Sequence, residues 1–82
     1  MSENRRVAVI GLGYVGLPLA SLCAKQGYHV VGFEKNEAVV GKLQAGNSHI
    51  NDETVEQLLG QALISGNFFP TSDINELAEC VI

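Results

Sequence analysis

Three glycines near the start of the chain have a spacing that suits phosphate binding. Gly11, Gly13 and Gly16 form a G-x-G-x-x-G pattern directly after residues 7–10, a short apolar run with β-branched side chains. A stretch dotted with small residues follows and ends at Gly27. Where such glycines join a strand to a helix, the first permits a tight turn, the second lets a pyrophosphate touch the backbone, and the third lets the helix lie close to the sheet. The pattern therefore predicts a dinucleotide site at the N-terminus of this helix.

A carboxylate further along the chain supports the same prediction. Glu34 lies 18 residues beyond Gly16, at the end of an expected strand over residues 29–34. An acid in this place accepts hydrogen bonds from the ribose hydroxyls of the adenosine, and its charge repels the extra phosphate of NADP. We therefore expect NAD as the cofactor, although the neighbouring Lys35 could offset part of that repulsion and leaves NADP as an alternative. The alternative interpretation of Glu34, without the glycine pattern, is an ordinary solvated residue at a strand end.

The residues between the glycines complete the candidate site. Tyr14 and Val15 lie where the turn would be exposed to a cofactor, and simple packing over the helix start is the alternative interpretation. The candidate cofactor-binding residues are Gly11, Leu12, Gly13, Tyr14, Val15, Gly16, Glu34 and Lys35.

The other reactive side chains form no catalytic or metal-binding pattern in the sequence. His29 lies at a strand start and His49 in a polar loop, and neither has a carboxylate or nucleophile at a spacing typical of a catalytic site. Cys23 and Cys80 form no metal or redox motif, so we expect both to be free, buried thiols. No residue of this chain is therefore assigned a catalytic or metal-binding role.

The composition argues against nucleic-acid and membrane partners. The chain has 82 residues and a net charge of −4, and it carries no basic stripe of the kind that binds nucleic acid. No stretch approaches the ~20 apolar residues that span a bilayer. Because residues 1–6 lack the apolar centre of a signal peptide, we expect a cytoplasmic protein.

Apolar periodicity predicts alternating strands and helices. Such alternation indicates an α/β protein with an open, mostly parallel sheet of the Rossmann type, doubly wound and with right-handed crossovers.

Asn36 and Gly46 are expected to cap the second helix, and Pro70 suggests that the third strand ends early or lies at an edge. In the first helix, Leu19, Leu22 and Cys23 are expected to supply bulk beside small residues that approach the sheet. The expected strands are residues 5–10, 29–34 and 68–69, and the expected helices are residues 14–26, 36–45, 52–64 and 74–79.

The last residues predict an unfinished sheet. Cys80-Val81-Ile82 begin an apolar segment of three residues, whereas a parallel strand normally needs five or six. We therefore expect residues 1–82 to be a partial domain, truncated after the start of a fourth strand, from a longer enzyme. Such a piece should expose apolar sheet edge and be loose or self-associating.

The glycine-rich segment strongly resembles a known family signature. Residues 7–20, and above all the continuation Tyr-Val-Gly-Leu-Pro at residues 14–18, resemble the N-terminus of the UDP-glucose/GDP-mannose dehydrogenase family. Residues 31–36 and 69–73 are similar to the second and third strand ends of that family, so the resemblance covers essentially the whole chain. Glu34 stands where aspartate is more usual in the family.

The resemblance implies a parent enzyme that oxidises the C6 alcohol of a nucleotide sugar to a carboxylate, with two NAD molecules in succession and a thiol-bound intermediate. It implies that the three glycines form the pyrophosphate turn, that Tyr14 and Val15 offer backbone contacts and that Glu34 holds the ribose. The family's catalytic cysteine lies in a downstream motif that this chain lacks, so the chain alone should be inactive. The parent is expected to be a homo-oligomer.

One departure from the family pattern bears on the substrate. Many members carry a Glu-Pro-Gly turn where residues 49–53 read His-Ile-Asn-Asp-Glu, and relatives that act on N-acetylated UDP-sugars look similar here. This favours a substrate of that group. Two alternatives remain open: another NAD(P)-dependent dehydrogenase of the β-hydroxyacid type, and a non-catalytic nucleotide-binding module.

Overall fold

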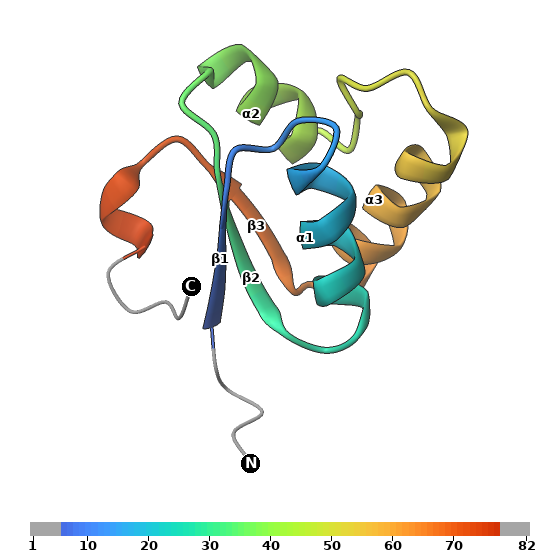
Figure 1. Cartoon of the computed structure of the whole chain (residues 1–82), viewed down its shortest axis with the longest axis horizontal. Helices are drawn as coiled ribbons and strands as arrows, with labels where there is room; N and C mark the ends of the chain where they lie inside the picture. Colours follow the sequence, from blue (N-terminus) through green and yellow to red (C-terminus); the bar gives the residue numbers. More distant parts are fainter. Residues whose placement is uncertain (1–5, 78–82) are drawn as a thin grey trace.

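The computed structural model of the protein describes residues 6–77. Strands and helices alternate along this part of the chain, as the sequence predicts (Figure 1). In chain order the elements are β1 (Arg6–Ile10), α1 (Gly16–Lys25), β2 (His29–Phe33), α2 (Glu37–Gln44), α3 (Glu53–Ser65), β3 (Phe68–Thr71) and a 3₁₀ helix, η1 (Ile74–Leu77).

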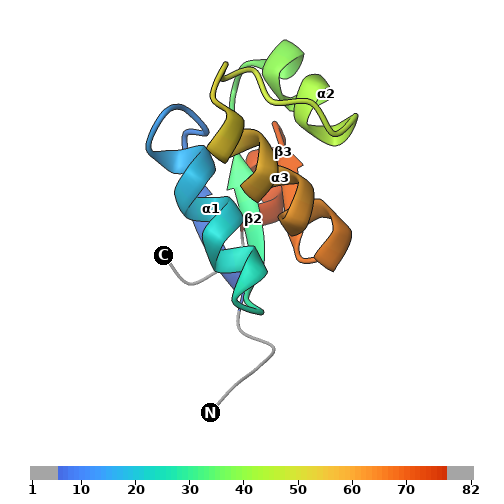
Figure 2. The ribbon, with the colours of Figure 1, turned by 90° about the vertical axis from the view of Figure 1, so that its right-hand side faces the viewer.

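The strands of residues 6–77 form one parallel sheet in the order β1-β2-β3. Arg6 at the start of β1 lies opposite His29, and Phe33 at the end of β2 lies opposite Thr71. Helices α1 and α3 cover one face of the sheet, while η1 lies on the other face (Figures 1 and 2). Because all strands are parallel, their carboxyl ends meet at the same end of the sheet. The arrangement confirms the expected Rossmann-type α/β fold.

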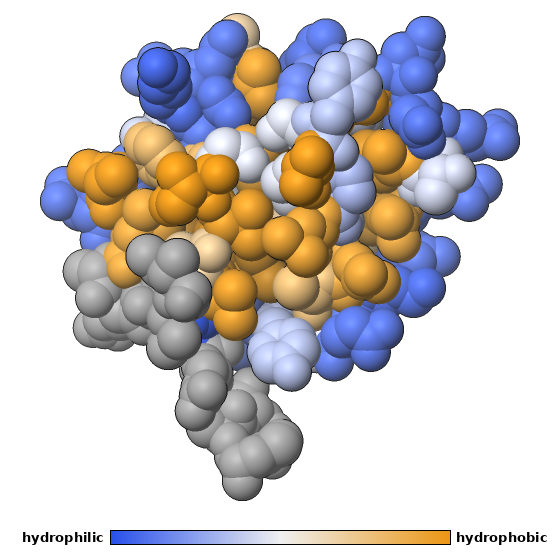
Figure 3. Space-filling model, in the orientation of Figure 1, coloured by the Kyte–Doolittle hydropathy of each residue, from blue (hydrophilic) through white to orange (hydrophobic). Residues whose placement is uncertain are grey.

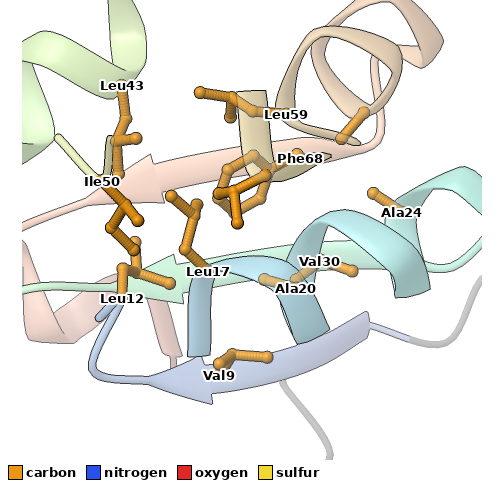
Figure 4. Close-up of a cluster of buried hydrophobic side chains, with 12 residues drawn as sticks. Val9, Leu12, Leu17, Ala20, Ala24, Val30, Leu43, Ile50, Leu59 and Phe68 are labelled. Carbon is orange, nitrogen blue, oxygen red and sulfur yellow. The ribbon is translucent and has the colours of Figure 1, made fainter. Parts of the chain in front are cut away.

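Helix α1 buries two sides, one against the sheet and one against α3. Ala20 and Ala24 have no exposed surface and let the helix approach closely, as their spacing predicts, and Leu17 supplies the bulk. Leu19 and Leu22 are instead 50% and 44% exposed, so the expectation that they pack beside the small residues is wrong. Helical geometry turns them away from the side that carries the three buried residues. The buried cluster comprises Val9, Leu12, Leu17, Ala20, Ala24, Val30, Leu43, Ile50, Val55, Leu59, Ala62 and Phe68 (Figure 4).

The helix ends follow from their capping residues. Helix α1 begins at Gly16, so Pro18 falls in the first turn, where its missing N–H leaves no bond unmade. This agrees with the expectation from Pro18 that the regular helix begins a residue or two after residue 14. Before α2, the Asn36 side chain accepts a hydrogen bond of 3.0 Å from the N–H of Ala38, which confirms Asn36 as a cap. Gly46 directly follows the C-cap of α2 with a φ of +89°, a left-handed conformation that favours glycine.

The outer edge of β3 is closed to further strand pairing. The strand continues through Pro70 to Thr71, so the expected early end is wrong, whereas the expected edge position is confirmed. Pro70 has no N–H to offer, and its carbonyl accepts a hydrogen bond of 3.0 Å from Nε2 of Gln44. An edge strand tolerates a proline because only one of its sides must donate to a neighbouring strand.

The end of the described chain turns onto the face of the sheet opposite α1 and α3. Thr71 Oγ1 accepts a hydrogen bond of 3.0 Å from the N–H of Asp73, and Asp73 Oδ1 accepts one of 2.9 Å from the N–H of Asn75. The helix expected to run to residue 79 is described as η1 up to Leu77, and the expected fourth strand at residues 80–82 lies outside the described residues. None of the helices within residues 6–77 has the length and apolarity to cross a membrane.

Candidate cofactor-binding site

The glycine turn closes on itself through backbone contact. Gly11 adopts a φ of +86°, which side-chain-bearing residues rarely do, and its N–H donates to the carbonyl of Phe33 at 2.8 Å. A Cβ placed on Gly16 would lie 1.8 Å from the Gly11 carbonyl oxygen. Only glycine therefore fits at the first and last positions of the turn, for two different reasons.

The outer side of the turn is open. A Cβ placed on Gly13 would meet no atom within 4 Å, so the absence of a side chain here leaves space that the protein itself does not fill. Tyr14 and Val15 follow with 83% and 80% of their surface exposed. Both side chains thus lie on the surface beside the turn, and neither packs over the helix start.

The N-terminus of α1 differs from the other α-helices of the described chain. Asn36 and Asp52 cap α2 and α3 with side-chain oxygens, and both of those helices carry acidic residues in the first turn. The capping position of α1 is Val15, which makes no side-chain hydrogen bond, and its first turn holds no acid. The first N–H groups of a helix can bind an anionic ligand, although here the Leu17 N–H already donates to the Gly13 carbonyl at 3.0 Å and Pro18 has no N–H to offer.

Leu12 anchors the turn to the core. Its side chain is fully buried, in the cluster that includes Ile50 and Leu17 (Figure 4). It occupies the space above Gly32 in β2, where a Cβ would lie 2.9 Å from Leu12 Cδ2 and 2.9 Å from Phe68 Cε1. Of the predicted site residues, Leu12 is therefore the one whose side chain points into the protein.

Glu34 links the turn to the end of β2. Its Oε1 accepts a hydrogen bond of 3.1 Å from the Leu12 N–H, and its Oε2 accepts one of 3.0 Å from the Asn36 N–H. The Glu34 N–H in turn donates to the Thr71 carbonyl at 2.9 Å. Glu34 as a whole is half-buried, and it lies at the carboxyl ends of the strands, beside the open side of the turn. Each carboxylate oxygen has a second lone pair that can accept from another donor.

These contacts hold the Glu34 side chain in its charged form. The hydrogen bond from Leu12 lowers the pKa of Glu34 most, followed by that from Asn36, while burial raises it. The charges of His49 and Lys35 lower the pKa further. A fixed negative charge therefore lies next to the glycine turn at neutral pH.

The pKa of Glu34 predicts how stability depends on pH. Because it is lower in the folded protein than the ordinary value of about 4.3, the carboxylate stabilises the fold fully above that value, and this contribution is lost as the pH falls through the folded pKa. We expect wild type to exceed Glu34→Gln in free energy of unfolding at pH 7, with a difference that shrinks toward pH 3. Urea unfolding followed by circular dichroism measures both. An unchanged difference over this range would contradict the assignment of the charge to Glu34.

The comparisons with known proteins decide the family. Residues 5–82 match the model of the NAD binding domain of the UDP-glucose/GDP-mannose dehydrogenase family. The chain belongs to this family. The match favours it over the dehydrogenases of the β-hydroxyacid type.

Individual members of the family agree with this assignment. The UDP-N-acetyl-D-mannosamine dehydrogenase of Pyrococcus horikoshii is 38% identical over 72 residues, which are 88% of this chain and 17% of that protein. A UDP-glucose dehydrogenase structure from Pyrobaculum islandicum has a TM-score of 0.82 and 38% identity, over 89% of this chain and 17% of that one. A GDP-mannose dehydrogenase structure from Pseudomonas aeruginosa has a TM-score of 0.80 and 30% identity, over 87% and 16%. The chain thus spans about a sixth of the length of these relatives.

As an NAD-binding domain of this dehydrogenase family, the chain has features that fit the cofactor. The open space at Gly13 and the uncapped start of α1 suit a diphosphate, and the carboxylate of Glu34 suits a ribose. Lys35 is exposed directly beside that carboxylate. No group of three or more His, Cys, Asp or Glu side chains in residues 6–77 could hold a metal ion.

The structure adds neighbours that sequence reasoning missed. His49 was interpreted as an ordinary loop histidine, yet its charge acts on Glu34, and its Nδ1 is buried without a hydrogen-bond partner among the described residues. Asn36 was predicted only as a cap, but its N–H also binds Glu34. The contact with Asn36 could have been found from its position two residues after the acid. The position of His49 could not, because it depends on how the α2–α3 loop folds back.

Proposed function

We propose that this chain is the N-terminal part of the NAD-binding domain of a longer nucleotide-sugar 6-dehydrogenase. The parent would oxidise the C6 alcohol of a UDP-sugar to a uronic acid, and the chain alone would be inactive. The observation that carries the proposal is the pairing of an open glycine turn with a charged Glu34 that is bonded to it. A cytoplasmic location is part of this proposal.

We assign each residue of the site a part in holding the cofactor. The backbone at Gly11, Gly13 and Gly16 would surround the pyrophosphate, with Tyr14 and Val15 contacting it from the exposed side. Glu34 would accept hydrogen bonds from the adenosine ribose through its remaining lone pairs, and Lys35 would lie along the same rim. When bound, NAD supplies a nicotinamide that accepts a hydride from the substrate carbon. Residues 6–77 orient and bind it, while proton transfer and covalent chemistry belong to the downstream part of the enzyme.

We propose an N-acetylated UDP-hexosamine as the substrate class. Several relatives, including the Pyrococcus horikoshii protein, are named as UDP-N-acetyl-D-mannosamine dehydrogenases. The segment 49–53, which lacks the Glu-Pro-Gly turn, supports the same group. NADH formation by the longer enzyme with UDP-N-acetylmannosamine and with UDP-glucose tests the proposal, and a preference for UDP-glucose would contradict it.

Titration of NAD and NADP by calorimetry tests the cofactor site. We expect wild type to bind NAD more tightly than NADP, and Glu34→Gln to weaken NAD binding by about 10-fold or more, because hydrogen bonds to a charged acceptor contribute about 1.5–3 kcal/mol. NADP binding should weaken less, because the neutral amide no longer repels the 2′-phosphate. Glu56→Gln, at an exposed acid of α3, is the matched control and should bind NAD like wild type.

Circular dichroism must show that each variant is folded before its affinity is compared. A folded wild-type chain that binds neither dinucleotide would argue against the cofactor site and favour a non-catalytic module. Equal NAD affinity of wild type and Glu34→Gln would remove Glu34 from the site while leaving the glycine turn in place.

A further inference from the structure

We propose that His49 is a further cofactor-binding residue, whose ring Nε2 donates a hydrogen bond to a ribose hydroxyl oxygen of the adenosine. This inference rests on the proposed function, because it adds one contact to the same site. The proposed site otherwise uses the glycine turn, Glu34 and Lys35, and the loop between α2 and α3 has no part in it.

The backbone around His49 is held in place by short contacts. The Ser48 hydroxyl accepts a hydrogen bond of 2.9 Å from the Ile50 N–H and donates one of 2.9 Å to the Ile50 carbonyl. Ile50 is 3% exposed and packs in the buried cluster beside Leu12 of the glycine turn (Figure 4). His49 is therefore fixed between a tight hydrogen-bonded turn and an anchor in the core, in a loop that adjoins the glycine turn.

This loop lies at the same end of the sheet as Glu34. Figures 1 and 2 show it beside the glycine turn, at the carboxyl ends of the strands. The charge of His49 acts on the Glu34 carboxylate and lowers its pKa, so the two side chains are close enough to interact electrostatically. Figure 3 shows hydrophilic side chains gathered along this end of the molecule, above the apolar middle. A polar ligand held by Glu34 would therefore meet the ring of His49 at the same rim.

The two ring nitrogens of His49 have different surroundings. Nδ1 is buried without a hydrogen-bond partner among the described residues, and buried N–H groups without an acceptor are rarer than buried acceptors without a donor. We therefore assign the proton of the neutral ring to Nε2, and in the charged ring Nε2 carries a proton as well. Nε2 makes no hydrogen bond within residues 6–77 and is not among their buried atoms, so it reaches the surface as a donor.

A ribose hydroxyl bound to Glu34 still has room for a donor. The hydroxyl gives its one hydrogen to the carboxylate, and its oxygen keeps lone pairs that accept hydrogen bonds. The carboxylate has no hydrogen to give at neutral pH, because the N–H groups of Leu12 and Asn36 hold it in its charged form. The Nε2–H of His49 supplies this donor from a half-buried ring. Lys35 is exposed on a long side chain, so fixing it on the ribose costs more conformational entropy.

Binding of ADP and of its dideoxy analogue to His49 variants tests the proposal. ADP carries the adenosine ribose and a diphosphate, and the analogue lacks both free ribose hydroxyls. We expect His49→Leu, which keeps a side chain of similar size, to weaken ADP binding about 5-fold, the change expected for one neutral hydrogen bond. The analogue should bind equally well to His49→Leu and wild type. Titrations followed by the amide NMR signals of the glycine turn measure both affinities, once circular dichroism shows that the variant is folded.

Two further variants separate a hydrogen bond from a structural role. His49→Gln places an amide donor close to the position of Nε2 and should restore ADP affinity nearly to that of wild type. A loss as large as that in His49→Leu would contradict the assignment of the donor to Nε2. His29→Leu is the matched control, because His29 is a half-buried histidine at the start of β2, at the opposite end of the strand from Glu34. It should bind ADP like wild type.

Nitrogen NMR spectra of the histidine rings give a measurement on the unmodified chain, which does not depend on a variant folding. ADP should shift the Nε2 signal of His49 more than its Nδ1 signal and leave the signals of His29 unchanged. The dideoxy analogue should leave the Nε2 signal of His49 in place.

The outcomes separate this inference from the proposed function. Equal ADP affinity of His49→Leu and wild type overturns the inference, as does an equal loss for ADP and the analogue, because His49 would then support the turn rather than contact the ribose. A wild type that binds ADP while Nε2 of His49 is unaffected also overturns it and leaves the proposed function standing. A folded wild type that binds neither ADP nor NAD contradicts the proposed function itself.

Discussion

Gly16→Ala is expected to prevent stable folding of the chain. The added Cβ would lie 1.8 Å from the Gly11 carbonyl oxygen and 2.9 Å from its carbonyl carbon, and both are backbone atoms that no rotamer change can move. Relief requires α1 or the turn to shift, at a cost of about 3 kcal/mol or more, a large share of the roughly 5 kcal/mol that stabilises many small domains. Urea unfolding followed by circular dichroism measures the loss.

Gly41→Ala provides the control for this prediction. It is the same substitution in a helix, but Gly41 is exposed in α2 and a Cβ there would meet no atom within 4 Å. Helix propensity alone predicts a gain of about 0.5–1 kcal/mol. If Gly16→Ala were as stable as wild type, the close contact between the two ends of the turn would be wrong. If both substitutions were destabilising, general sensitivity of the helices would be the cause.

Leu12→Ala is expected to lower both stability and NAD affinity. The fully buried side chain fills the space above Gly32, so its truncation leaves a cavity and costs about 2–5 kcal/mol. The N–H of the same residue is bonded to Glu34, so loosening of the turn also loosens the carboxylate. We expect NAD affinity to fall by more than the unfolded fraction accounts for. Unfolding curves and calorimetric titration, both at low temperature, separate the two effects.

Leu59→Ala distinguishes loss of the anchor from loss of core packing. Leu59 is buried in the same cluster as Leu12, but it belongs to α3 and not to the glycine turn. It should lose a similar free energy of unfolding, while the molecules that remain folded bind NAD normally. A proportional loss of affinity in both variants would mean that the turn responds to stability in general, and that Leu12 has no special part.

Much of the fold could be predicted because its signals are local. The glycine spacing, the β-branched run before it and the cap at Asn36 each act within a few residues, and the structure has the corresponding turn and helix starts. The exposure of Leu19 and Leu22 could not be predicted in the same way, because it depends on which side of α1 faces α3. That is a property of packing between elements, which periodicity within one helix does not contain.

The same division holds for the candidate site. Gly11, Gly13, Gly16 and Glu34 were found from spacing, and the structure brings them together at the carboxyl ends of the strands. The inward position of Leu12 was not found, since the pattern assigns a role to the glycines and none to the residue between them. The continuation of β3 through Pro70 was not predicted, because it depends on a contact between elements. The Gln44 side chain of α2 donates a hydrogen bond to the outward-facing carbonyl of Pro70.

Glu34 ties the choice of dinucleotide to the folding of the domain. The carboxylate that would discriminate against a 2′-phosphate is also the acceptor for two main-chain amides, those of Leu12 and Asn36. A variant that changed its coenzyme to NADP by replacing Glu34 would also remove the acceptor of both amides. Such a change of coenzyme therefore requires a compensating substitution elsewhere, and we expect single replacements at this position to be selected against before any gain in the new activity can appear.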